Sequence, residues 1–470
     1  MSDSIAHTVA KIKSGELSAV AVVTEALERA KTDNHNAVIE LLEDSALSHA
    51  RKIDEAIAAG TEVGPLAGIP YVAKDNYLTH DGHTTAASNI LKPFVAPYQA
   101  TAVNKLEEAG AILIGKANLD AFAHGGSTEN SDFGPTTNPA DSTRVAGGSS
   151  GGPVAAVAAG IVPFALGTDT GGSIREPSSF CGVVGLKPTY GLISRYGVIA
   201  MASSTDCLGP IAKTVVDAAL VLDVMAGRDA RDGTSIERDE VSYTNLEENL
   251  TGKKFGLIKQ YMAEGVDEAV RSAVLAAAET IKAAGGEVVD VDLPALELAL
   301  ACYYIIVPAE ISSNLGRYDG VRYGLSSSTG RDLNDVYEQT REEGFNAENK
   351  RRIMIGTFVT GSGYHDAYYL KAQTVRSKLI AEFAKAFEVA DFLIGPVAPT
   401  PAFKLGELTA DPLQMYLIDI MTVAANLVGV PSISIPLPVD ELPIGLQIMA
   451  PQRQDRSVLA SAKSLEEKLR

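Results

Sequence analysis

Apolar residues recur at helical spacing in several stretches of this chain, and most of these stretches have a residue suited to a helix end. Ser18 is a suitable N-cap for a helix over 19–31, and Asp267 for a longer helix that Gly285-Gly286 ends. The same pattern predicts helices over 44–59, 102–109, 153–159, 214–226 and 457–469. We therefore expect N-terminal helices within residues 3–60 and further helices along the chain.

Short apolar runs of strand length lie between these helices. One of them, 69–73, ends immediately before Lys74. The others cover 111–115, 162–166, 255–258, 287–291, 392–394, 432–435 and 446–449. Helices that alternate with short apolar strands predict an α/β layered fold. Because no repeat or convincing linker divides the chain, we expect a single domain over 1–470.

The composition and the cysteines indicate a soluble protein of the cytoplasm. Hydrophobic residues make up 46% and charged residues 21% of the 470 positions, which is typical of globular proteins. Cys181, Cys207 and Cys302 follow no metal-ligand spacing and are expected to be reduced thiols. The first seven residues lack the order of a signal peptide. Residues 145–168 carry no charge, but their glycines and prolines argue against a membrane span.

Net charge bears on possible nucleic-acid partners. The 40 basic and 59 acidic residues give a net charge of −19. Affinity for nucleic acids depends largely on neutralising phosphates, so this chain would on average repel tRNA. If the function involves tRNA, we expect another chain to hold it.

Candidate chemistry lies in a glycine-rich region. Ser173 ends the turn Thr-Gly-Gly-Ser (170–173), where successive backbone N–H groups can converge on an anion. A serine beside such donors has the arrangement that acyl transfer needs, although an isolated Gly-Gly-Ser is more often an ordinary helix cap. Two other interpretations fail: residues 147–152 lack the Lys-Ser/Thr ending of a P-loop, and Asp169-Thr170-Gly171 has no second copy to form an aspartic-protease pair.

A serine nucleophile needs a base, and no histidine stands beside either candidate serine. Lys74 is the alternative, because burial would lower its pKa toward neutrality. A lysine at a strand end is otherwise usually a solvated charge, and His80 and His83 are expected to be surface residues. The residues alone leave the catalytic interpretation open.

Three linked segments strengthen it: Gly-Gly-Ser-Ser-Gly-Gly (147–152), Gly-Thr-Asp-Thr-Gly-Gly-Ser-Ile-Arg (167–175) and Phe-Cys-Gly-Val-Val-Gly-Leu-Lys-Pro-Thr (180–189). They resemble the amidase signature family, and the likeness runs over nearly the whole chain, with a core at about 68–210. Within this family the chain is most similar to the glutaminase subunits of tRNA-dependent amidotransferases, through segments at 194–204, 312–324 and 351–369. The resemblance implies a central mixed β-sheet covered by helices on both faces.

The resemblance also implies roles for individual residues. Ser173 matches the acyl-forming nucleophile, Ser149 the bridging serine of a cis peptide, and Lys74 the base. The backbone amides of Thr170, Gly171, Gly172 and Ser173 would form the oxyanion hole. The substrate's α-amino and α-carboxylate groups would be held at Tyr303, Arg352 and Asp419, with Ser127 as a weaker candidate contact.

Alternatives remain at several of these positions. Arg352 could be a structural ion-pair member, because Arg351 stands beside it. Three residues depart from the usual pattern of these glutaminase subunits: Pro153 replaces a small residue, His124 a methionine and Glu176 a glutamine. None of the three belongs to the implied triad, and His124 could line the pocket.

The implied function is hydrolysis of glutamine to supply ammonia for converting Glu-tRNA(Gln) to Gln-tRNA(Gln). A B subunit that uses ATP and Mg²⁺ and a small C subunit would complete a heterotrimer, and this chain itself would bind no cofactor or metal. The runner-up is a stand-alone amidase of the same family that acts on a small amide. A scaffold subunit without activity is a third hypothesis, which the intact triad disfavours.

Overall fold

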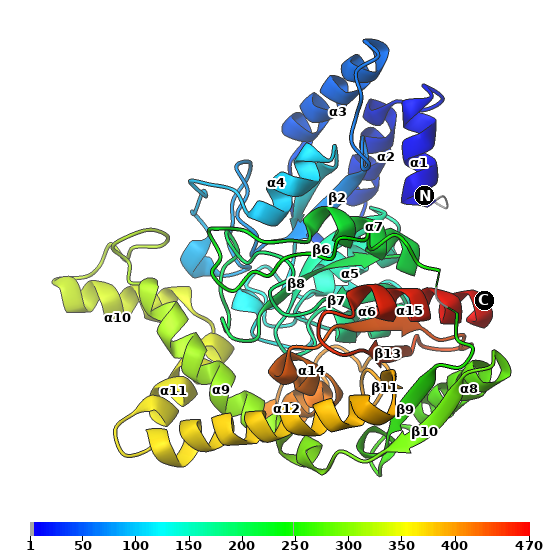
Figure 1. The fold of residues 1–470 in the computed structure, drawn as a ribbon. Helices are drawn as coiled ribbons and strands as arrows, with labels where there is room; N and C mark the ends of the chain where they lie inside the picture. Colours follow the sequence, from blue (N-terminus) through cyan, green and yellow to red (C-terminus); the bar gives the residue numbers. More distant parts are fainter. Residues whose placement is uncertain (1–3, 248) are drawn as a thin grey trace.

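The computed structural model describes residues 4–247 and 249–470. Residues 1–3 and 248 lie outside the described residues. The predicted domain over 1–470 includes all four of them, and the predicted N-terminal helical region begins at residue 3. Figure 1 shows a long twisted sheet with helices packed on both sides. The predicted α/β class, with a mixed sheet covered on both faces, is confirmed.

Eleven strands form the main sheet, in the order β1-β3-β2-β6-β8-β7-β12-β13-β11-β9-β10. Their bounds are β1 Val38–Leu41, β2 Pro70–Lys74, β3 Ile112–Ala117, β6 Phe164–Asp169, β7 Val184–Lys187, β8 Cys207–Ala212, β9 Lys254–Ile258, β10 Glu287–Val291, β11 Phe392–Pro396, β12 Ser432–Pro436 and β13 Gly445–Met449. The sheet is mixed, because β2 runs parallel to β3 and β6 whereas β8 runs antiparallel to β6. A separate hairpin joins β4 (Thr137–Asn138) and β5 (Asp141–Val145).

The α-helices of the described residues surround this sheet. Their bounds are α1 Ile5–Lys13, α2 Ala19–Lys31, α3 Glu43–Ala58, α4 Thr101–Glu108, α5 Gly151–Ala158, α6 Arg175–Cys181, α7 Val215–Met225, α8 Glu268–Ala283, α9 Ala299–Asn314, α10 Leu333–Gly344, α11 Ala347–Thr360, α12 Lys371–Val389, α13 Pro412–Leu417, α14 Val423–Val428 and α15 Asp455–Leu469. The seven helices expected between 19 and 469 are present, and Ser18 Oγ caps α2 by accepting the Ala21 N–H. The N-terminal helices are interrupted by β1, an edge strand that the sequence pattern did not predict.

The core lies on both faces of the sheet. Along β11, Phe392 and Ile394 belong to one large buried cluster, whereas Leu393, between them, belongs to a second. Side chains alternate between the faces of a strand, so both faces are covered. Helices α9, α12 and α14 contribute to the second cluster, and α2, α7 and α15 to the first.

The topology places two polar strand ends side by side. Strands β2 and β6 are parallel neighbours with Ala73 opposite Leu166, so their carboxyl ends meet at the same edge. Lys74 is the last residue of β2 and Asp169 the last of β6. The catalytic candidates of the glycine-rich region therefore converge at this edge.

One apolar helical stretch, residues 294–317, is long enough to cross a membrane by composition. Of its most apolar window, 56% is buried inside the protein, where α9 packs on α11 and α12. The uncharged stretch 145–168 instead forms the end of β5, helix α5 and most of β6.

Candidate active site

Lys74 is completely buried at the end of β2 and surrounded by hydroxyl groups. Its Nζ lies 2.7 Å from Ser149 Oγ, 2.9 Å from Ser150 Oγ and 2.9 Å from Thr168 Oγ1. Among the described residues, no carboxylate lies within ion-pair distance of this amine. The contact predicted between Lys74 and Ser149 is therefore present.

Burial also changes the acidity of Lys74. Loss of solvent around the amine lowers its pKa to about 7, although Asp120, Asp169 and Asp206 act in the opposite direction. At neutral pH a large fraction of Lys74 is uncharged. An uncharged amine can accept a proton, so this lysine has the property that a general base requires.

The loop before α5 presents Ser149 and Ser150 to Lys74. The Gly148–Ser149 peptide bond is cis, as the resemblance implies, and both serines are fully buried. Thr128 Oγ1 donates a 2.7 Å hydrogen bond to the Gly147 carbonyl. Ser150 Oγ donates to the Thr168 carbonyl at 3.1 Å, which ties this loop to β6.

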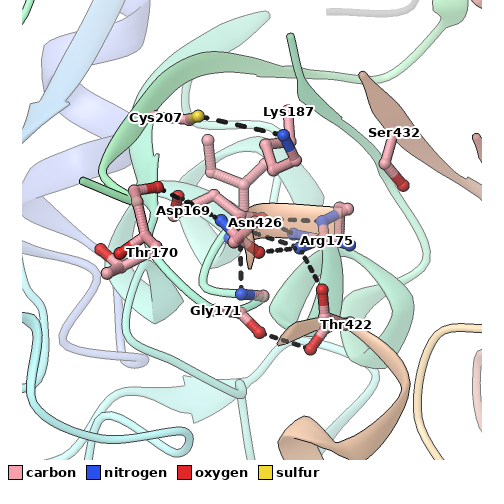
Figure 2. Close-up of polar contacts among 12 residues, drawn as sticks. Asp169, Thr170, Gly171, Arg175, Lys187, Cys207, Thr422, Asn426 and Ser432 are labelled. Carbon is pink, nitrogen blue, oxygen red and sulfur yellow. Dashed lines mark hydrogen bonds and ion pairs between the residues drawn. The ribbon is translucent and has the colours of Figure 1, made fainter. Parts of the chain in front are cut away.

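The turn that carries Ser173 wraps around the Asp169 carboxylate. Asp169 accepts hydrogen bonds from the Gly172 N–H at 2.9 Å and the Ile174 N–H at 3.2 Å. Arg175 pairs with it through Nε and Nη2, both at 3.0 Å (Figure 2). Burial alone would raise the pKa of Asp169, but Arg175 above all holds it at about 2. The turn is thus built around a permanently charged ion pair.

Ser173 itself is partly accessible. Ser150 donates its N–H to the Ser173 carbonyl at 3.1 Å, so the two serine segments lie side by side. Within the described chain, the Ser173 hydroxyl has no hydrogen-bond partner, so it is not hydrogen-bonded to Ser149. The first contact of the predicted relay is formed here, whereas the second is not a hydrogen bond in this structure.

The predicted oxyanion hole needs one correction. The Gly172 N–H already donates to Asp169 and cannot also stabilise an oxyanion. The N–H groups of Thr170, Gly171 and Ser173 have no acceptor among the residues described. These three are the amides left free to bind a developing negative charge.

Tyr303, predicted to contact substrate, lies on α9 directly against this turn. A side chain at Gly171 would overlap the Tyr303 ring, its ideal Cβ lying 2.5 Å from the phenol oxygen. Thr422 holds the same turn from another direction by donating to the Gly171 carbonyl at 2.5 Å (Figure 2). Tyr303 and the segment around Thr422 thus enclose the N–H groups next to Ser173.

Arg352 is buried on α11, 3% exposed, and it is oriented by three side chains. Its Nε donates to Glu348 at 2.8 Å, and its guanidinium lies 5.4 Å from the Tyr304 ring and 5.3 Å from the Tyr416 ring. Its two terminal nitrogens have no acceptor within the described part of the chain. The ion pair that the sequence left open exists, yet it leaves the end of the guanidinium free for a carboxylate.

Asp419 lies on the short 3₁₀ helix η7 (Ile418–Met421), close to Arg352 through a shared neighbour. Tyr304 donates its hydroxyl to Asp419 at 2.8 Å. Limited access to water raises the pKa of Asp419 to about 7, against the lowering effects of Tyr304 and Arg352. An ammonium group binding here would stabilise the ionised carboxylate.

Two of the four substrate-binding candidates, Ser127 and Arg352, line a small cavity of about 60 Å³, whereas Tyr303 and Asp419 do not line it. Tyr416 also lines this cavity, and an added Cβ on Gly126 would lie 4.0 Å from Asp419. His124 is fully buried and does not line this cavity; its Nδ1 lies 2.8 Å from Asn349 Nδ2. Pro153 lies in the first turn of α5, where a proline costs no hydrogen bond.

Sequence reasoning missed several residues that shape the site. The sequence motifs assign no role to Ser150, the second serine of its pair, and for Asp169 they suggest only half of an aspartic-protease motif. Tyr304, next to Tyr303 in the sequence, orients Asp419. Glu348, one helical turn before Arg352, orients that arginine. Helical spacing could have suggested Glu348, whereas nothing local identifies Tyr304. The described residues contain no group of three His, Cys, Asp or Glu side chains placed to hold a metal.

Comparison with known proteins agrees with this geometry. The model of the Amidase family matches residues 21–459. The chain therefore belongs to the amidase family, whose members include the amidase signature enzymes.

Its relatives give a narrower class. It is 52% identical to the A subunit of glutamyl-tRNA(Gln) amidotransferase from Thermosynechococcus vestitus, over 90% of this chain and 89% of the relative. The corresponding protein of Carboxydothermus hydrogenoformans is 49% identical over 97% and 95% of the two chains. The solved structure of the same protein from Thermotoga maritima has a TM-score of 0.79 at 40% identity, covering 96% and 91%. The peptide amidase of Stenotrophomonas maltophilia scores 0.83 at 30% identity, covering 100% and 97%.

Proposed function

We propose that this chain is the glutaminase subunit of a tRNA-dependent amidotransferase in the cytoplasm. It hydrolyses glutamine and supplies ammonia for the conversion of Glu-tRNA(Gln) to Gln-tRNA(Gln). About half of all positions are identical to proteins named as A subunits of glutamyl-tRNA(Gln) amidotransferase, which supports the choice of reaction. The observation that carries the chemistry is the buried amine of Lys74, which lies 2.7 Å from Ser149 Oγ in a loop whose Ser150 N–H donates to the Ser173 carbonyl.

In this proposal, Lys74 and the two serines form a proton relay. Neutral Lys74 accepts the proton of Ser149, and Ser149 accepts that of Ser173 once the Ser173 hydroxyl turns toward it. Ser173 Oγ then forms a bond to the carboxamide carbon of glutamine, and the carbonyl electrons move to the oxygen. The N–H groups of Thr170, Gly171 and Ser173 stabilise that oxyanion.

The relay then runs in reverse. Collapse of the tetrahedral intermediate breaks the C–N bond, and the nitrogen takes up a proton from the relay and leaves as ammonia. The product on the enzyme is a γ-glutamyl ester of Ser173. Water attacks this ester with the same base, and glutamate leaves.

Glutamine recognition follows from the charges at the other end of the site. The free nitrogens of Arg352 face the α-carboxylate, and Asp419 accepts the α-ammonium group. Tyr303 packs along the side chain beside Gly171, and Ser127 lines the same cavity as Arg352. An amino acid with both α-groups free therefore fits better than an N-acylated amide.

The remaining steps belong to other chains. The relatives are named as lettered subunits of an amidotransferase, which indicates an assembly of several chains. We propose a heterotrimer with a B subunit that uses ATP and Mg²⁺ and holds most of the tRNA, and a small C subunit. The net charge of −19 supports a division of labour in which this chain contributes little to tRNA binding.

The test combines a glutaminase assay with a serine-reactive probe. We expect glutamate release from glutamine, and labelling that is present in the wild type and absent in Ser173→Ala. Ser457→Ala, on the C-terminal helix α15, is the control and should be labelled like the wild type. Equal labelling of Ser173→Ala, or no glutamine hydrolysis with partner subunits present, would refute the proposal.

A stand-alone amidase is the second candidate, because the Stenotrophomonas peptide amidase matches the fold as well as the Thermotoga amidotransferase structure does. That enzyme class has no need for Arg352 and Asp419 as a pair. Purification from the native host decides between them. A monomer that hydrolyses simple amides but is indifferent to glutamine would favour the second candidate.

A further inference from the structure

Glu176 is a buried acid that the relay does not use. It lies on α6, three residues after Ser173, and its side chain is 0% exposed. One carboxyl oxygen, Oε2, accepts a 2.9 Å hydrogen bond from the Gly148 N–H, and Gly148 directly precedes Ser149. The other oxygen, Oε1, is buried and has no partner in the described chain. Glu176 therefore connects the segment after the nucleophile to the loop of the bridging serine.

The packing around this contact leaves no room for a side chain at either glycine before Ser149. An added Cβ on Gly147 would lie 2.6 Å from Glu176 Oε2, and a side chain on Gly148 would overlap the Asp120 carboxylate. Two buried acids, Glu176 and Asp120, thus enclose the two glycines before Ser149. Movement of the Glu176 carboxyl group would break the hydrogen bond that holds the backbone directly before Ser149.

The charges nearby oppose ionisation of Glu176. Among the described residues, no lysine or arginine lies within 4 Å of its carboxyl group. Arg175, the basic neighbour on α6, is occupied by Asp169, Thr422 and Asn426. The basic residue of the adjacent strand β7 is Lys187, whose Nζ contacts the Pro188 carbonyl. The ionisable groups that act on Glu176 or respond to it are acidic: Asp120, Asp169, Asp419 and the Cys181 thiol.

Burial without a counter-charge favours the neutral acid. Burial raises the pKa of Glu176 well above its ordinary value, and the three aspartates raise it further, against the lowering effect of the Gly148 hydrogen bond. A neutral carboxyl group still accepts the Gly148 N–H. It does so without placing a fourth negative charge beside three carboxyl groups.

We propose that Glu176 is a positioning residue, whose protonated carboxyl group fixes the Ser149 loop relative to the Ser173 turn. The kinetic test of this proposal rests on the proposed glutaminase function. The unfolding test needs no enzymatic activity, so it can fail or succeed independently of the glutaminase proposal.

The first experiment is urea unfolding of the full chain at several pH values, for the wild type and Glu176→Gln. The unfolded chain loses the Glu176 proton above a pKa of about 4.3, while the native chain keeps it. Wild-type stability relative to Glu176→Gln should therefore fall as pH rises, by about tenfold in the unfolding constant per pH unit. Glu55→Gln, an exposed site on α3, should show no such trend. If the ratio of the wild-type unfolding constant to that of Glu176→Gln does not change with pH, the proposal is overturned.

The second experiment measures glutamine hydrolysis in the assembled complex. Glu176→Gln keeps a neutral acceptor of the same shape and should retain kcat within about threefold, whereas Glu176→Ala should lose about tenfold or more with little change in KM. If Glu176→Ala does not fold, Glu176→Gln still decides the matter. A loss in Glu176→Gln as large as that expected of Glu176→Ala would mean that the charge is needed, and would refute the proposal.

Discussion

Three lysines among the described residues are completely buried, and their surroundings differ at the level of single contacts. Lys116 forms an ion pair with Asp75 at 3.0 Å, and Lys187 contacts the Pro188 carbonyl. Lys74 contacts three hydroxyl groups, one of which belongs to Ser149. Burial lowers the pKa of all three, but only the Lys74 amine is placed to exchange a proton with a serine.

The pH dependence of activity tests this distinction. Because the pKa of Lys74 is about 7, kcat measured at saturating glutamine, where weaker binding through Asp419 does not count, should fall about tenfold per pH unit below that value and level off above it. Lys74→Met should lose about a thousandfold in kcat, a typical value for loss of a general base. The residual kcat of this variant at saturating glutamine should show no inflection near pH 7. An unchanged inflection in the variant would show that another group is the base.

Asp419 provides a second test, measured through KM. Because its pKa is about 7 in the free protein, most of the Asp419 carboxyl groups are protonated and uncharged below pH 7 when no glutamine is bound. Glutamine should therefore bind more weakly below pH 7. Asp419→Asn should raise KM about tenfold or more with a smaller effect on kcat. A variant whose KM matches the wild type at pH 8 would show that the ammonium group binds elsewhere.

At the scale of elements, α9 and α11 form one unit of the binding site. Tyr303 lies on α9 and Arg352 on α11, and Gly356 of α11 packs against the backbone of Pro308 on α9. A Cβ on Gly356 would overlap the Pro308 carbonyl oxygen. The position of Arg352, one turn earlier on the same helix, therefore depends on this close contact.

Substitution of Gly356 by alanine should separate the two helices. We expect a loss of about 1–3 kcal/mol in the free energy of unfolding, measured by urea denaturation, together with a higher KM for glutamine. Gly316→Ala is the matched control, because an added Cβ there meets nothing within 4 Å. Equal stability of the two variants would show that the helices can move apart without cost.

The elements that were predicted from the sequence are those with a clear period or a clear boundary. Strand β2, which ends at Lys74, is a short apolar run, and α2 and α8 have both period and caps. Helices α9 and α11 are not predicted, because α9 is apolar on nearly all sides and α11 has a charged first half and an apolar second half instead of an apolar stripe. Strand β8 contains Gly209 and Pro210, two residue types that are uncommon inside strands, so its sequence does not predict a strand. The candidate triad is implied by the resemblance that the linked motifs carry. The loss of the Gly172 N–H to Asp169 depends instead on a turn geometry that the sequence does not show.

At the scale of the whole molecule, the excess of acidic residues governs what the surface attracts. We expect the isolated chain to bind tRNA more weakly than the 10⁻⁴–10⁻⁶ M that is typical of non-specific binding, at physiological salt. Filter binding with the chain alone and with its partner subunits would measure this. Tight, salt-sensitive binding by the isolated chain would show that a local basic surface outweighs the net charge of −19.

The contacts of the Arg175 side chain also bear on when this chain can fold during its own translation. It joins the Ser173 turn to Asn426 at 2.7 Å and to Gln447 at 3.2 Å, residues 251 and 272 positions further along the chain. A growing polypeptide on the ribosome contains Lys74, Ser149 and Ser173 long before these partners have been made. The reactive serine is therefore not held in its final geometry until translation is nearly complete, and chains shortened to end before residue 420 should react with the serine probe no faster than Ser173→Ala.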